Sequence, residues 1–396
     1  MTDIIAKHLA PIKPSPTLAI AARAKALQAQ GEKIISLSLG EPDLHTPEHI
    51  KEAAIKAIRD GFTKYTEADG IPSLKQAIID KFKRDNNLDY TPKQIIVSCG
   101  AKHAIYNACH ALLNPGDEVV IPAPYWVSYS DIVLLAHAKP VIVYAPIEQH
   151  YKITPEQLEA AITPKTKLVF ICSPSNPTGV VYTHAELRAL AEVLLRHPQV
   201  YILSDDIYEA IYWAPEPFAN IVMVCPELYD RTLVINGVSK AYSMTGWRIG
   251  YTAGPKEIIE AMGTLQSQNT SNPTSISQVA AEAALRGSQE CVTDMCKVFK
   301  QRYELLNAQL SKIVGFRTVP AQGAFYLFPD VSECMKQLTM QDDVQFCEYL
   351  LNTAKVAVVP GSAFGAPGHI RLSYAIAEKE GLQAIEQINK AVCFKK

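Results

Sequence analysis

The nine residues VYILSDDIY, positions 200–208, start with an apolar run and end in two acids and a tyrosine. Six other short runs are similarly apolar or β-branched. Several of the seven would be apolar on both faces, as in a parallel sheet that helices cover on each side. The pattern predicts seven strands, at Ile95–Cys99, Glu118–Ile121, Val141–Tyr144, Leu168–Cys172, Val200–Ser204, Thr232–Asn236 and Gly250–Ala253.

The segments between these strands are helical in pattern, and two of them carry clear start signals. Thr154 is followed three residues later by Gln157, and Thr183 by Glu186. Each pair can exchange hydrogen bonds with the backbone as a capping box. Strands that alternate with helices predict an α/β domain with a mainly parallel sheet, whose ligand crevice lies at the carboxyl ends of the strands.

Two more helices are expected before the first strand. Thr17–Gln30 is rich in alanine and stops at Gly31, which suits a left-handed C-terminal cap. In the next helix, Thr46 is expected to be the N-cap and Pro47 the first helical residue. Gly61 ends that segment.

Beyond about residue 290 the regular alternation of strand and helix ends. A long helix is expected at about Glu290–Ile313, then strands at Gly323–Phe328, Lys355–Val359 and Ile370–Tyr374, and helices around Asp343–Leu351 and from Ala377 onward. This pattern predicts a second, smaller α+β domain. The expected organisation is an N-terminal arm and helix in residues 1–45, packed with the small domain, a large domain in residues 46–290, and the small C-terminal domain in residues 291–396.

The composition favours a globular protein whose partners are small molecules. Lys and Arg total 38 against 40 for Asp and Glu, with no block of one sign, which argues against nucleic acid or an anionic membrane as the main partner. No apolar run approaches the roughly 18 residues of a membrane span and no signal-peptide pattern begins the chain, so a cytosolic location is expected. The nine scattered cysteines predict reduced core thiols, and the lack of C-x-x-C and H-E-x-x-H motifs gives a metal site no support.

The strongest local signal is NGVSKAYSMTGWRIG, residues 236–250. Lys240 follows a buried strand through a Gly-Val-Ser turn, so its amine can lie in a crevice, where desolvation favours the neutral form that condenses with an aldehyde. A lone loop lysine is ordinarily solvated, so this assignment depends on its companions. Arg248, eight residues on, could grip a phosphate or carboxylate through two parallel hydrogen bonds, although an isolated arginine is more often a surface ion-pair residue.

Polar turns follow three more of the buried strands. Asp205 or Asp206 could hold a protonated heterocyclic nitrogen, with Tyr208 donating to an anionic oxygen, but an aspartate here could equally cap the turn. The turn SPSNPTG, residues 173–179, shows by itself only a rigid connection. The segment SCGAK, residues 98–102, opens a helix whose first amides could bind phosphate. No Walker loop and no G-x-G-x-x-G follows a strand, so neither an NTPase nor a nicotinamide enzyme is favoured.

Together these motifs resemble the class I aminotransferases of pyridoxal-phosphate fold type I, and most closely the bacterial aspartate aminotransferases. S-x-S-N-P-T-G, S-D-[DE]-I-Y, S-K-x-[YF]-x-M-T-G-W-R-I-G and H-I-R-L-S-Y occur in the order and approximate spacing of that family, from about Ile12 to the C-terminus. The resemblance implies a homodimer that uses pyridoxal 5′-phosphate and transfers the amino group of L-aspartate to 2-oxoglutarate by a ping-pong course.

The resemblance also implies catalytic and cofactor-binding residues. Lys240 would be the Schiff-base lysine that moves a proton between the substrate α-carbon and the cofactor, and Asp205 would keep the pyridine nitrogen protonated. Tyr208 and Asn176 would hydrogen-bond the cofactor's phenolate oxygen. Trp126 would stack on the ring, although a tryptophan beside two prolines can also simply fill a core gap. The positions similar to the family's phosphate ligands are the amides of Gly100, Ala101 and Lys102, with Ser239, Arg248 and, from the neighbouring subunit, Tyr65.

At the substrate, the resemblance makes Arg371 the ligand of the α-carboxylate, approached by the backbone of Gly40, with Trp126 and Asn176 beside it. Fixing that carboxylate would orient the Cα–H bond for cleavage. Lys102 resembles a lysine that, in one subgroup, receives the distal carboxylate of aspartate or glutamate. Lys13 resembles a lysine associated there with prephenate, so prephenate is a possible second substrate.

Other functions stay open on the sequence alone. Prephenate, an aromatic amino acid or alanine could replace aspartate as the amino partner. Related folds use the same lysine in β-eliminating lyases, which release ammonia without a keto acid. A cofactor-binding regulator of this fold usually carries an added DNA-binding segment, but here the N-terminal arm is too short and not basic enough to suggest one.

Overall fold

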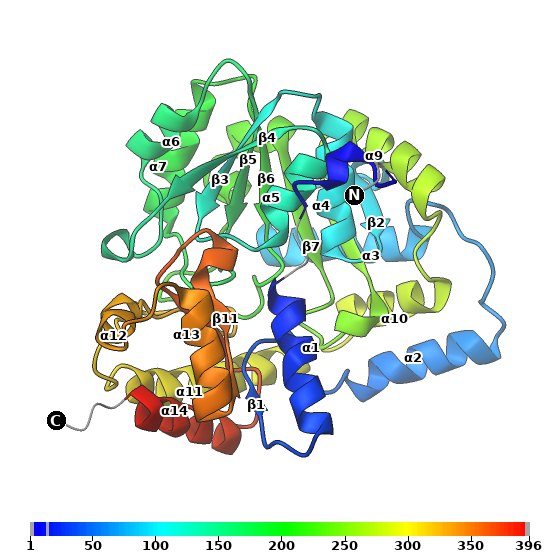
Figure 1. Cartoon of the computed structure of the whole chain (residues 1–396). Helices are drawn as coiled ribbons and strands as arrows, with labels where there is room; N and C mark the ends of the chain where they lie inside the picture. The colour runs from blue at the N-terminus through cyan, green and yellow to red at the C-terminus, as the bar shows by residue number, and fades with distance from the viewer. Residues whose placement is uncertain (1–3, 13–15, 393–396) are drawn as a thin grey trace.

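A computed structural model shows the fold and describes residues 4–12 and 16–392 (Figure 1). All seven expected strands form one sheet, in the order β2-β8-β7-β6-β5-β3-β4. Only β8 is antiparallel to its neighbours, so the prediction of a mainly parallel sheet is confirmed. The strands are β2 (Ile95–Ser98), β3 (Glu118–Ala123), β4 (Lys139–Tyr144), β5 (Thr166–Cys172), β6 (Tyr201–Asp205), β7 (Thr232–Gly237) and β8 (Gly250–Ala253).

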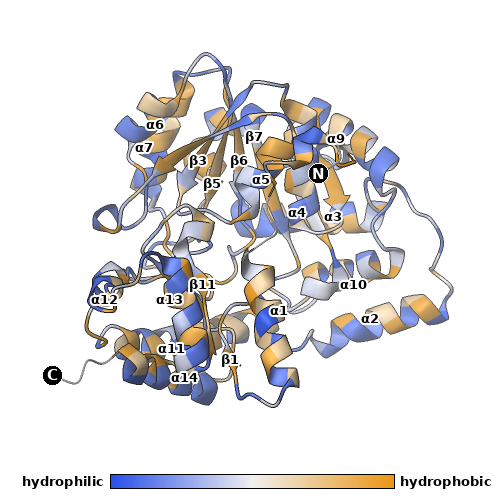
Figure 2. Cartoon of the chain, in the orientation of Figure 1, coloured by the Kyte–Doolittle hydropathy of each residue, from blue (hydrophilic) through white to orange (hydrophobic). Residues whose placement is uncertain are grey.

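Helices cover both faces of this sheet because the inner strands are apolar on both sides. On β5, Leu168 and Phe170 pack toward one helix layer, while Val169 and Ile171 pack toward the other. The first layer comprises α4 (Ala101–Leu112), α5 (Ser128–Leu135) and α9 (Lys256–Asn269). The second includes α2 (Glu48–Arg59), α3 (Pro72–Asn86), α6 (Pro155–Ala161), α7 (His184–Leu195), α8 (Ile221–Val224) and α10 (Ser275–Arg286). Figure 2 shows the hydrophobic strands between these layers.

The helix starts follow the sequence signals with one exception. Both capping boxes form: Thr154 Oγ1 accepts from the Gln157 amide at 3.3 Å, and Thr183 Oγ1 from the Glu186 amide at 3.2 Å. The prediction for Thr46 is wrong, because α2 begins two residues later and its N-cap is Pro47. The Thr46 hydroxyl instead donates to the carbonyl of Ser243 at 2.7 Å, so a tertiary contact has replaced the local one.

A second hydrophobic cluster lies below the large sheet in the view of Figure 1. It is built on the three-stranded antiparallel sheet β11-β12-β9. Its elements are α11 (Glu290–Leu310), β9 (Tyr326–Leu327), α12 (Ser332–Gln337), α13 (Asp343–Tyr349), β10 (Val356–Ala357), β11 (Val359–Pro360), β12 (Ile370–Ser373) and α14 (Glu378–Val392).

The predicted strand Lys355–Val359 is wrong as a single strand. Its first part, β10, pairs in parallel with β1 (Ile35–Ser36), whereas β11 pairs with β12. After Ala357 the chain passes from the two-stranded sheet β1-β10 to the three-stranded sheet β11-β12-β9. The helix α1 (Pro16–Ala29) packs beside β1, where Ala24 and Ile34 contact Leu351 and Ala357. The domain boundaries at residues 45 and 290 stay a prediction.

Among the helices of the described residues, none is both long and apolar enough to cross a membrane.

Candidate active site

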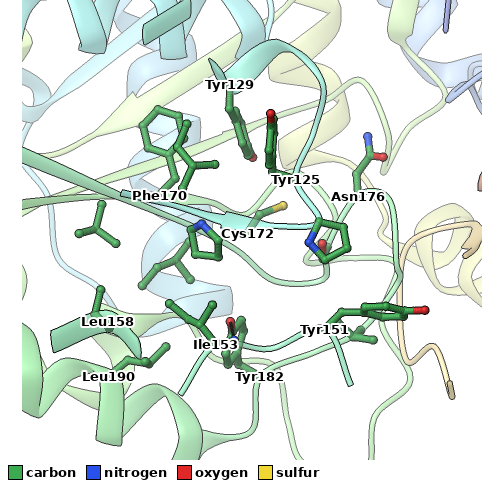
Figure 3. Close-up of a pocket in the computed structure, with 17 residues that line it drawn as sticks. Tyr125, Tyr129, Tyr151, Ile153, Leu158, Phe170, Cys172, Asn176, Tyr182 and Leu190 are labelled. Atoms are coloured by element: carbon green, nitrogen blue, oxygen red, sulfur yellow. Dashed lines mark hydrogen bonds between the residues drawn. The ribbon is translucent and has the colours of Figure 1, made fainter. Parts of the chain in front are cut away.

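A cavity of about 280 Å³ lies at the carboxyl ends of β5, β6 and β7. Its walls include residues expected at the site, namely Gly40, Ala101, Lys102, Trp126, Asn176, Asp205, Tyr208, Ser239, Lys240, Arg248 and Arg371. A smaller cavity of about 30 Å³ adjoins it and shares Tyr129, Cys172 and Asn176 (Figure 3). That volume is room for roughly two water molecules. The larger cavity is therefore the candidate site for an organic ligand.

Lys240 lies in the turn after β7, and its amine reaches the cavity. Gly237 makes this turn possible, because an added Cβ would lie 2.9 Å from the carbonyl oxygen of Ile249. The Lys240 amine donates to the carbonyl of Gly40 at 2.5 Å, and none of the ion pairs formed by the described residues includes it. Burial lowers its pKa to about 8, against the opposing charge of Glu41. This lysine is thus prepared to act as a neutral nucleophile.

The depressed pKa of Lys240 predicts a pH dependence of its reactivity. The rate of condensation with a small aromatic aldehyde, trapped by borohydride and located by peptide mass mapping, should rise about tenfold per pH unit below pH 8 and level off above it. The exposed Lys256, which reacts in the same sample, is the internal control for modification of a surface lysine outside the cavity. A Lys240 rate that keeps rising tenfold per pH unit above pH 8 would contradict the prediction.

Asp205 ends β6 at the floor of the cavity. Its side chain is buried, and Tyr129 donates a hydrogen bond to its Oδ2 at 2.5 Å. Burial raises the pKa of Asp205 above its ordinary value, while the hydrogen bond from Tyr129 and the charge of Lys240 oppose that rise. The Ile207 amide also donates to its Oδ1, at 3.4 Å. A buried carboxylate with acceptor capacity left is suited to binding a cationic N–H group of a ligand.

Asp206 is held away from the cavity by a network of its own. Ser204 Oγ and Asn220 Nδ2 each donate to it at 2.7 Å. Burial, together with the nearby charge of Glu209, raises the pKa of Asp206 to about 7. Because its oxygens are occupied in this way, Asp206 is less suited than Asp205 to hold a protonated nitrogen of a ligand.

Tyr208 and Arg371 join the large sheet to the three-stranded sheet. The Tyr208 hydroxyl lies 2.7 Å from that of Tyr326 on β9. Arg371, on β12, donates to Asn176 Oδ1 at 3.0 Å and to the carbonyl of Ser38 at 2.6 Å. Its Nε is buried and has no hydrogen-bond partner in the described part of the chain, so a donor remains for an anion.

Arg248 and Lys102 form a second cationic region of the cavity wall. Arg248 donates to the carbonyls of Thr245 and Cys99, and an added Cβ on Gly100 would lie 2.3 Å from its guanidinium. Glycine is therefore required where this arginine crosses the start of α4. The first amides of that helix lack a carbonyl partner within it, which suits them to an anion. Lys102 adds a further charge 5.0 Å from the ring centroid of Trp126.

The remaining expected residues lie elsewhere. Gly100 lies next to the cavity rather than on its wall. Tyr65 is 90 % exposed, and Lys13 falls outside the described residues. The sequence analysis missed Tyr129 and Tyr326, which contact Asp205 and Tyr208. Tyr129 follows Trp126 by three residues at the start of a helix, which is its only sequence signal.

Comparisons with known proteins agree with this arrangement. The profile of the family described as aminotransferase class I and II matches residues 32–388. The aspartate/prephenate aminotransferase of Nitrosomonas europaea is 52 % identical, over 97 % of this chain and 98 % of that protein. The aspartate aminotransferase of Geobacillus stearothermophilus is 53 % identical, over 98 % of each chain.

Solved structures show the same likeness. The aspartate aminotransferase of Rhizobium meliloti superposes with a TM-score of 0.94 at 46 % identity, covering 99 % of both chains. The enzyme of Thermus thermophilus, solved with maleate, gives a TM-score of 0.92 at 41 % identity, covering 98 % of this chain and all of the other. With a matching profile over most of its length and relatives above half identity, the chain belongs to the class I and II aminotransferase family.

Proposed function

We propose that this aminotransferase uses pyridoxal 5′-phosphate to transfer the amino group of L-aspartate to 2-oxoglutarate. The observation that carries the proposal is one cavity that holds a partly buried lysine of lowered pKa, a buried carboxylate and a buried arginine with an unused donor among the described residues. The relatives and solved structures named as aspartate aminotransferases support the same substrate.

The cavity residues fit the proposed cofactor. Asp205 matches a protonated ring nitrogen, and the Tyr208 hydroxyl and Asn176 amide match an anionic ring oxygen. The phosphate fits the region around Arg248, because Ser239 and the amides of Ala101 and Lys102 belong to the same cavity. Trp126 also lines this cavity, and its ring is suited to stacking on the cofactor. When bound, pyridoxal phosphate supplies an electron sink for the electrons of the broken Cα–H bond.

Each side chain then has a defined task. The Lys240 amine would hold the cofactor covalently and, once displaced by the substrate amine, would accept the proton from the substrate α-carbon, which its lowered pKa permits near neutral pH. The Asp205 carboxylate keeps the proton on the ring nitrogen. Arg371 binds the substrate α-carboxylate and so holds the Cα–H bond in one orientation.

Lys102 is proposed to receive the distal carboxylate of the substrate. Its amine lies over Trp126 at the cavity wall, and burial together with the charge of Arg248 lowers its pKa. Lys102 and Arg371 line the same cavity, and two cations there favour amino acids with two carboxylates. Two relatives are named aspartate/prephenate aminotransferases, so prephenate is proposed as a second acceptor, with Lys13 as the residue that favours it.

The proposed enzyme is a homodimer with shared active sites. Its support is an exposed apolar group near the end of α2, in which Ile58 is 52 %, Phe62 40 % and Tyr65 90 % exposed. Such groups are typical of protein interfaces. In the dimer, Tyr65 would reach the phosphate site of the neighbouring subunit. A cytosolic location stays a prediction.

The proposal predicts which amino acids convert the loaded enzyme. With no keto acid present, L-aspartate and L-glutamate should change the absorbance of the bound cofactor in single-turnover mixing much faster than L-phenylalanine or L-alanine. Lys102→Met should slow the two dicarboxylates by about 10–100-fold, the worth of one hydrogen bond to a charged group, and phenylalanine by less than about threefold.

Three controls separate the alternatives. Lys93→Met removes a lysine outside the cavity and should leave every rate unchanged. Ammonia released from aspartate without a keto acid would indicate a lyase. If aspartate leaves the absorbance unchanged while another amino acid converts it, the aspartate assignment is wrong.

A further inference from the structure

Tyr326 is part of the cavity wall, although no sequence motif marks it. It lies on β9, its side chain is fully buried, and it lines the cavity. Its hydroxyl is 2.7 Å from that of Tyr208, and its ring lies 4.6 Å below the guanidinium carbon of Arg371. An added Cβ on Gly40 would come within 2.5 Å of the same hydroxyl. One side chain therefore contacts the groups assigned to both the cofactor and the substrate.

The hydroxyl contact determines how Tyr208 can donate. A phenol has one proton, so when Tyr208 donates to a ligand oxygen, the bond between the tyrosines must be donated by Tyr326. A hydroxyl that accepts one hydrogen bond becomes a stronger donor of the next. In the ligand-free site, burial and the contact with Tyr326 raise the pKa of Tyr208, whereas the charge of Arg371 opposes that rise and so favours donation by Tyr208.

The ring contact determines how Arg371 is held. Its guanidinium lies between the rings of Tyr326 and Phe364, at 4.6 and 4.9 Å from their centroids. Hydrogen bonds to Asn176 and Ser38 fix the plane of the guanidinium within this sandwich. The Nε atom is left free. Without the ring of Tyr326, the Arg371 side chain would have more conformational freedom. It would lose that freedom on binding a carboxylate, which would weaken binding.

We propose that Tyr326 is a positioning residue with two separable effects: its hydroxyl strengthens the hydrogen bond from Tyr208 to the cofactor, and its ring aligns Arg371 for the substrate carboxylate. This inference rests on the proposed function and adds a residue to it. Phenylalanine at this position would keep the ring and lose the hydroxyl. Leucine would lose both.

The test uses the full-length enzyme loaded with pyridoxal phosphate and two readouts other than turnover. The first is the pH midpoint of the cofactor's absorbance change. A hydrogen bond donated to the ring oxygen stabilises the deprotonated state, so a weaker bond raises the midpoint. The second is the Kd of maleate, a dicarboxylate without an amino group. Tyr208→Phe is the reference, and Tyr374→Phe is the matched control, because Tyr374 is an equally buried phenol that donates to the carbonyl of Ala324.

Tyr326→Phe should raise the midpoint by about half a pH unit, less than Tyr208→Phe does, and leave the Kd of maleate within about twofold. Tyr326→Leu should raise that Kd about tenfold or more. The control should change neither.

An unchanged midpoint in Tyr326→Phe, beside a clear shift in Tyr208→Phe, would overturn the proposal and leave the proposed function intact. A changed maleate Kd in Tyr326→Phe would overturn the separation of the two effects. If the wild-type chain binds no cofactor, both the inference and the proposed function fail.

Discussion

Replacement of Lys240 by alanine is expected to lower kcat with aspartate and 2-oxoglutarate by a factor of about 10⁴ or more, because the variant loses both the covalent attachment and the proton acceptor. The variant should still fold, since the side chain opens onto the cavity and, among the described residues, forms a single hydrogen bond, to the carbonyl of Gly40. Turnover and the melting temperature, measured together, check both statements.

Lys256→Ala is the control for this experiment, because Lys256 is a half-exposed lysine on α9, outside the cavity. It should retain full activity. If Lys240→Ala keeps more than about 1 % of wild-type turnover, general-base and covalent catalysis by this residue are refuted.

Replacement of Asp205 by alanine is expected to produce the second largest loss, of about 10³-fold in kcat. A buried charge that holds a proton on the ring acts in surroundings of low dielectric, where one such group contributes several kcal/mol to the transition state. The loss should appear in kcat more than in KM, because Arg371 and Lys102 still bind the carboxylates. Steady-state kinetics at saturating 2-oxoglutarate separates the two parameters.

Asp206→Asn is the matched comparison, since Asp206 is the adjacent and equally buried carboxylate. Asparagine would present an amide to the amide of Asn220, which now donates to Asp206, so the expected cost is about 1–3 kcal/mol of stability with kcat within about fivefold of wild type. A larger loss of kcat in Asp206→Asn than in Asp205→Ala would reverse the assignment.

The large sheet could be predicted because each strand is a short apolar run bounded by turn residues. Leu168 to Cys172 is one such run, and it packs on both faces as its composition requires. The two capping boxes could be predicted for the same reason. Thr154 and Thr183 each form theirs with the residue three positions later in the sequence. Lys240, Asp205 and Arg371 could be expected at one site because each lies in or after a strand within a specific motif.

Features that depend on a distant partner could not be predicted. The Thr46 hydroxyl binds Ser243, almost two hundred positions away, which no local pattern indicates. The segment Lys355–Val359 is one apolar run but pairs with two different strands. Tyr326 is likewise an ordinary core tyrosine in sequence, and only the pairing of β9 with β12 brings it under Arg371.

The hydrogen bond from Arg371 to Ser38 has a consequence for folding, because it joins residues 333 positions apart. A contact that closes so long a loop forms late, after the local elements have reduced the entropy of closure. Synthesis also releases β12 after every other strand of the described chain. The turn that carries Lys240 is therefore expected to take its place in the large sheet before Arg371 is in position to hold a carboxylate.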